Sequence, residues 1–68
     1  MSSFYEDVLA LMVKFFGKDT AKIMRTAYDE DRPRELLQVA RDMLSEVLGP
    51  KNVGTYLVPI MKKYHIRG

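Results

Sequence analysis

The feature that most constrains this chain is a pair of apolar stripes, one on each side of Gly49-Pro50. Apolar residues recur at steps of three and four residues from Leu36 to Leu48, and again from Val53 to Tyr64. This spacing places each set along one side of an α-helix, and a stripe of this width is normally buried against another element. The sequence therefore predicts an all-α fold.

Capping signals divide the chain into four predicted helices. Ser3 and Glu6 match a capping box at the start of the first helix. Gly17 supplies a residue that tolerates a left-handed C-terminal cap, and Gly49-Pro50 ends the third helix in the same way. We expect helices near residues 3–16, 20–28, 32–48 and 51–64, of which the second is short.

Pro59 lies inside the last of these helices. Proline lacks the amide that would bond to the Thr55 carbonyl, and its ring presses on that carbonyl, so we expect a kink or a break there. Beyond Tyr64 the chain carries no further apolar stripe. We expect residues 65–68 to form a frayed C-terminal tail.

A chain of 68 residues is long enough for one compact domain, so we expect residues 1–68 to form a single four-helix domain. It contains no cysteine, so the core must form without disulfides. The low count of heat-labile side chains, with Gln38 and Asn52 as the amides, fits a thermophilic source. We predict a core of Val8, Met12, Phe15, Ile23, Met24, Leu37, Ala40, Leu44, Val47, Val53, Leu57, Ile60 and Met61.

The sequence offers little for catalysis. His65 is the only histidine and lies near the C-terminus, which leaves no base for a nucleophile and too few ligands for zinc. Asp42 and Glu46 are one helical turn apart, a spacing more typical of a solvated surface than of an acid–base pair. No glycine-rich phosphate loop is present. We therefore expect a non-enzymatic protein with no cofactor, no metal and no small-molecule substrate.

The N-terminal residues resemble no targeting segment. Glu6 and Asp7 occur where a signal peptide would carry basic residues, and the uncharged run Val8–Val13 is far too short to span a membrane. We expect a cytoplasmic protein without a membrane partner.

Charge is distributed unevenly along the chain. Residues 1–50 contain seven basic and nine acidic residues, whereas residues 51–68 contain four basic residues and no acid. Lys18, Lys22 and Arg25 follow one another at steps of four and three, which places them on one helical face. Nucleic-acid binding through these residues, together with Lys62 and Lys63, is one hypothesis for function. The acidic segment Asp29–Asp31 argues against it, because it would approach the nucleic-acid backbone.

Protein association is the other hypothesis, and the one that we prefer. The first helix is apolar around more than half of its circumference, which is more than a small monomer easily covers. Once a stripe through Val8 and Met12 faces the core, Phe4, Tyr5, Leu9 and Val13 remain as a candidate interface, for example in a homodimer. The alternative is that three neighbouring helices surround the first helix and bury these residues.

Overall fold

A computed structural model describes residues 3–66 of the chain. These residues form four helices and no strand: α1 (Phe4–Phe16), α2 (Lys18–Ala27), α3 (Pro33–Leu48) and α4 (Pro50–Lys63). The predicted all-α, four-helix class is confirmed. Of the predicted tail, residues 67 and 68 lie outside the described part. His65 belongs to the turn after α4, and Ile66, which packs against the core, donates a 2.8 Å backbone hydrogen bond to the Met61 carbonyl.

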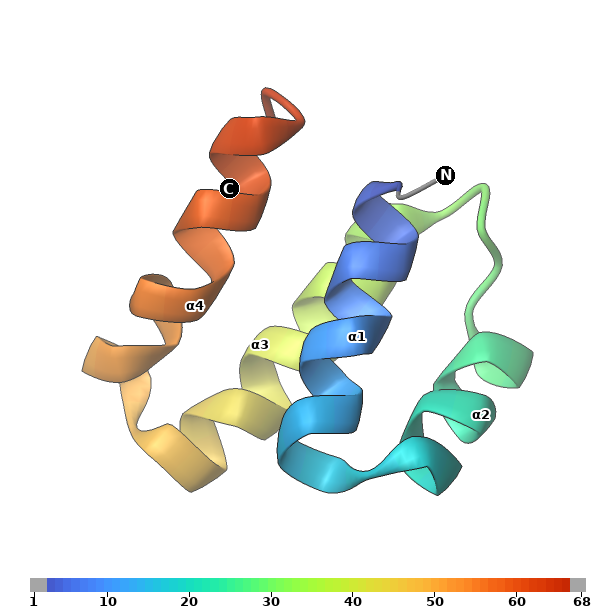
Figure 1. Cartoon of the computed structure of the whole chain (residues 1–68), viewed down its shortest axis with the longest axis horizontal. Helices are drawn as coiled ribbons and strands as arrows, with labels where there is room; N and C mark the ends of the chain where they lie inside the picture. Colours follow the sequence, from blue (N-terminus) through green and yellow to red (C-terminus); the bar gives the residue numbers. More distant parts are fainter. Residues whose placement is uncertain (1–2, 67–68) are drawn as a thin grey trace.

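Helix α1 occupies the centre of the fold. In Figure 1, α2 and α4 flank α1 on opposite sides and α3 runs behind it. Helix α1 packs against all three other helices, and α3 also packs against α4. Helix α2 packs mainly against α1, so most of its surface faces away from the rest of the molecule.

The connections between α1 and α2 and between α3 and α4 lie at the lower end of the fold in Figure 1, and each is made by a single glycine. Gly17 and Gly49 have φ angles of 94° and 85°, and each is both the C-cap of one helix and the residue before the next. Their ψ angles of 171° and 149° lie outside the left-handed helical region that we expected. This combination is adopted almost only by glycine, because a Cβ atom would meet the backbone.

One of the two hydrogen bonds of the predicted capping box is present at the start of α1. The Ser3 hydroxyl oxygen accepts a hydrogen bond of 3.1 Å from the Glu6 amide. The Glu6 carboxylate does not complete the box, because it forms a 2.7 Å ion pair with Arg25 of α2. The same residue therefore joins α1 to α2 instead of capping its own helix.

Helix α4 continues without interruption through Pro59, so the predicted break does not occur. Pro59 and Thr55 are both exposed, on the side of α4 opposite the buried Val53, Leu57 and Met61. A carbonyl that loses its amide partner on this side can be hydrated. The proline is therefore tolerated in the helix interior.

Helix packing buries a single apolar core, which our prediction identifies in part. Ile23 and Val47 are 69% and 57% exposed, so their predicted burial is wrong. Neighbouring helical positions are about 100° apart, and α2 turns Met24 rather than Ile23 toward α1. Val47 lies in the last turn of α3, at the end of the bundle.

Phe15 and Ile60 are only partly buried against the core. The core also contains four residues that we did not predict: Phe4, Tyr5, Leu9 and Leu36.

Candidate functional site

The interface predicted on α1 is not an exposed surface. Phe4, Tyr5 and Leu9 are only 7%, 4% and 2% exposed, and Val13 is half-buried. The alternative of a surrounded first helix is therefore correct, because α2, α3 and α4 together cover the apolar part of α1. The Tyr5 hydroxyl donates a 2.6 Å hydrogen bond to the Tyr28 carbonyl, and burial raises the pKa of Tyr5.

Two of the five candidate nucleic-acid contacts are engaged with the first turn of α1. Arg25 pairs with Glu6, and this hydrogen bond holds the pKa of Glu6 below its usual value. Lys63 lies 3.2 Å from Asp7, which also accepts a 2.8 Å hydrogen bond from the Tyr64 hydroxyl. The hydrogen bond from Tyr64 lowers the pKa of Asp7 most, and Lys63 lowers it further. These two cations link α2 and α4 to α1.

The three other candidate cations do not form one surface. Lys18 and Lys22 lie on α2, whereas Lys62 lies on α4, and these helices are on opposite sides of α1 (Figure 1). All three are exposed, and the ion pairs recorded within residues 3–66 include none of them. The predicted nucleic-acid surface is thus split into two separate regions.

The residues with acid–base potential lie apart on the surface. His65 is exposed in the turn after α4, and Asp42 and Glu46 are exposed on α3. Among residues 3–66, no three histidine, cysteine, aspartate or glutamate side chains lie close enough together to hold a metal ion.

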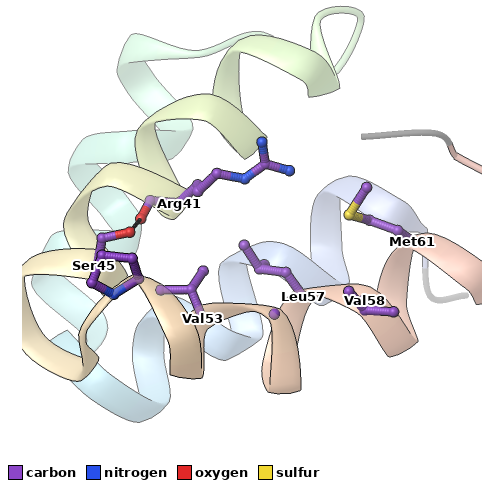
Figure 2. Close-up of a pocket in the computed structure, with 8 residues that line it drawn as sticks. Arg41, Ser45, Val53, Leu57, Val58 and Met61 are labelled. Carbon is purple, nitrogen blue, oxygen red and sulfur yellow. Dashed lines mark hydrogen bonds between the residues drawn. The ribbon is translucent and has the colours of Figure 1, made fainter.

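A groove lies between α3 and α4 (Figure 2). Its volume is about 290 Å³. Val53, Leu57 and Met61 of α4, which belong to the core and are only 3%, 2% and 8% exposed, form an apolar floor, and Val58, which is 42% exposed, stands at one side. The groove is lined by Arg41, Ser45, Pro50, Val53, Gly54, Leu57, Val58 and Met61.

Arg41 brings a positive charge to this apolar groove. Its side chain extends from α3 along the groove in Figure 2, while its backbone carbonyl accepts a 2.7 Å hydrogen bond from the Ser45 hydroxyl. Within residues 3–66, the structure records no ion pair or hydrogen bond for the Arg41 guanidinium. The guanidinium therefore has all of its donors available to an acceptor that enters the groove.

Arg41 is the one basic residue among those that line the groove, and further cations lie along the two helices beside it. Arg34 precedes Arg41 by seven residues and so lies on the same edge of α3, two turns away. On α4, Lys51 and Lys62 lie seven residues before and four residues after Val58, which places both on the Val58 edge. Neither edge carries an acidic residue. The acidic residues Glu35, Asp42 and Glu46 of α3 are on a neighbouring edge, farther from α4.

Gly54 leaves one part of the groove wall without a side chain. A Cβ atom at this position would meet only the Val58 side chain, at 3.8 Å, which is an ordinary van der Waals contact. Packing therefore does not require glycine here. A glycine in a helix interior costs about 0.5–1 kcal/mol relative to alanine, and it allows another chain to approach the backbone closely.

Sequence reasoning did not identify this groove. The basic C-terminal region and the apolar stripe of α4 were both visible in the sequence, but they were interpreted separately. The missing step was the register of α3 against α4, which brings Arg41 and Ser45 to the same groove as Val53 and Leu57. Periodicity within one helix carries no information about that register.

Among residues 3–66, none of the helices has the length and apolar character that would be needed to cross a lipid bilayer. No protein family model, curated protein or solved structure matches the chain.

Proposed function

We propose that this protein is a non-enzymatic binding module that takes a helical segment of a protein partner into the groove between α3 and α4. The observation that carries the proposal is an apolar floor bordered on both edges by cations, with an unengaged guanidinium, Arg41, inside it. The complementary ligand is an amphipathic helix whose apolar stripe is flanked by glutamate or aspartate.

The dimensions of the groove support a helix. Its α4 wall runs from Pro50 to Met61, which corresponds to about 16 Å at 1.5 Å per residue, or roughly three helical turns. Apolar anchors at positions i, i+3 or i+4, and i+7 of a partner helix would follow the floor. The groove is open to solvent, and this makes it less suited to a small molecule, because pockets for such ligands typically enclose most of the ligand surface.

Nucleic acid is the second class that this charge pattern could attract. Phosphate binding explains the cations Lys51, Lys62 and Arg34, but it gives no role to the apolar floor between the two edges. A helix with an acidic border uses both features, so it is the ligand that the groove favours.

The first prediction concerns a synthetic helical peptide of about 15 residues with a leucine stripe flanked by glutamate. We expect it to bind, and to shift the amide NMR signals of Val53, Leu57 and Met61. The same peptide with lysine in place of glutamate is expected to bind at least about tenfold more weakly, because it meets like charges.

Two variants test the site, each with a matched control. Arg41→Glu reverses the charge in the groove, and we expect about a tenfold loss of affinity; Lys18→Glu makes a comparable change on α2 and is expected to have little effect. Gly54→Leu fills the groove and is expected to weaken peptide binding. Its control, Val47→Leu, adds apolar volume to an exposed site elsewhere on α3 and is expected to have little effect. Circular dichroism checks that each variant remains folded.

The same measurements identify the outcomes that contradict the proposal. Equal affinity for the glutamate and lysine peptides would show that the basic edges do not select the ligand. If duplex DNA or the fatty acid dodecanoate bound the groove more tightly than the glutamate peptide, the groove would belong to another class of ligand. In the native host, a photo-crosslinker at Val58, compared with Val47, should capture a segment with an acidic, amphipathic helical pattern.

A further inference from the structure

The outer face of α2 is an exposed surface, separate from the groove. Ile23 is 69% exposed, which is the highest value among the large apolar side chains that the structure exposes. It lies in a shallow hollow of about 360 Å³ lined by Lys22, Ile23, Thr26 and Ala27. Apart from the Lys22 head group, this surface is formed by small or apolar side chains. We call these four residues the α2 face.

The α2 face points away from the body of the protein. Helix α2 turns Met24, which is 3% exposed, toward α1, and Lys22, Ile23, Thr26 and Ala27 are all exposed. In Figure 1, α2 lies at the edge of the molecule, with α1 between it and α4. A partner could therefore approach α2 without displacing any other helix.

Charges are segregated along this segment. Lys18 and Lys22 lie in the first half of α2, and the exposed Asp29, Glu30 and Asp31 follow its end. Asp19, in the first turn, lies four residues before Ile23 and so on the same side of α2, and it reduces the charge of residues 18–22 to +1 (Lys18 and Lys22 against Asp19). Within residues 3–66, no ion pair is recorded for Lys18, Lys22, Asp29, Glu30 or Asp31.

We propose that the α2 face binds a second copy of this chain, with the two α2 helices antiparallel about a two-fold axis. In this arrangement Ile23 of each copy packs over Thr26 and Ala27 of the other, because these residues are spaced three and four positions apart. The basic start of each α2 then lies beside the acidic Asp29–Asp31 segment of its partner. A two-fold axis makes this contact twice, which is the usual symmetry of a homodimer.

A parallel pair is disfavoured by the same charges. It would place Lys18 and Lys22 beside their own copies, and Asp29–Asp31 beside a second acidic segment. Like charges placed in register repel one another, so the charge pattern specifies the antiparallel orientation. Because only one helix of ten residues per copy forms the contact, the area is well below the standard interface of about 800 Å² per partner. We therefore expect a weak dimer.

Sedimentation equilibrium tests the proposal on the whole protein, from about 10 μM to about 1 mM. We expect a mass that rises from monomer to dimer over this range. Ile23→Glu should raise the dimer Kd by at least about tenfold, because it places a carboxylate in the centre of the contact. Val47→Glu makes the same kind of change at another exposed apolar residue and should leave the Kd unchanged.

Charge reversal tests the antiparallel orientation. One variant combines Lys18→Glu with Lys22→Glu, and a second combines Asp29→Lys with Glu30→Lys. Each variant alone should be monomeric, because like charges then meet at both ends of the contact. An equimolar mixture should form a heterodimer, because the two altered segments attract each other. The control is a variant with Lys51→Glu and Lys62→Glu, which reverses two charges on α4. Mixed with the Asp29→Lys, Glu30→Lys variant, it should not dimerise better than wild type.

The outcomes separate this proposal from the one for the groove. A monomer at every concentration, or a dimer unaffected by Ile23→Glu, would overturn the α2 dimer and leave the peptide-binding results intact. Association that appears only with duplex DNA would assign Lys18 and Lys22 to nucleic acid and would also overturn it. Conversely, the protein could dimerise through Ile23 while its groove binds no peptide. That result would contradict only the proposed function.

Discussion

At the scale of single residues, the first turn of α1 holds both flanking helices. Glu6 pairs with Arg25 of α2, and Asp7 accepts hydrogen bonds from Lys63 of α4 and from Tyr64. Neither set of contacts was predicted, because the sequence places the partners 19 to 57 positions away. The pKa values of Glu6 and Asp7 are both lowered by these contacts.

The lowered pKa of Asp7 predicts an acid-dependent loss of stability. Its native pKa lies below the ordinary value of 3.8, so its contribution is fully present above that value and is lost as the pH falls through the native pKa. Asp7→Asn should therefore lower the Tm at about pH 7, and the two Tm curves should converge toward about pH 2. Asp42→Asn, at an exposed site, is the control. A constant Tm difference at every pH would contradict a role for the Asp7 charge.

At the scale of the elements, the sequence predicted most of the fold and little of the site. All four helices occur within a few residues of the predicted bounds, because capping residues and apolar spacing are local signals. Which side of a short helix faces inward depends on its neighbours, and this is why Ile23 of α2 was wrongly assigned to the core. The groove and the α2 face both depend on such packing, so neither could be located from periodicity.

The two glycines near α4 provide a paired prediction about this element. Gly49→Ala should destabilise the protein by about 1–3 kcal/mol, because alanine is strained at a φ of 85°. Gly54→Ala should stabilise it by about 0.5–1 kcal/mol, because helical backbone accommodates alanine and the nearest contact, at 3.8 Å, is unstrained. Urea unfolding measures both. If the two changes had the same sign, the conformations described for these glycines would be wrong.

At the scale of the whole molecule, the two proposed surfaces are on opposite sides of α1. Helix α2 forms one edge of the fold, and the groove lies between α3 and α4 (Figures 1 and 2). A dimer formed through α2 therefore leaves both grooves open, one in each copy. With the proposed peptide site in each groove, dimerisation would make the protein bivalent without a new contact at the groove.

Bivalency predicts a difference between binding to dense and to sparse targets. On a surface densely coated with the glutamate peptide, the wild-type protein should dissociate at least about tenfold more slowly than Ile23→Glu, because a dimer must release two sites. On a sparse surface, and with the peptide free in solution, the two proteins should behave alike, since Ile23 lies outside the groove. Arg41→Glu should weaken binding at both densities. Equal dissociation rates for wild type and Ile23→Glu on the dense surface would show that the two sites do not act together.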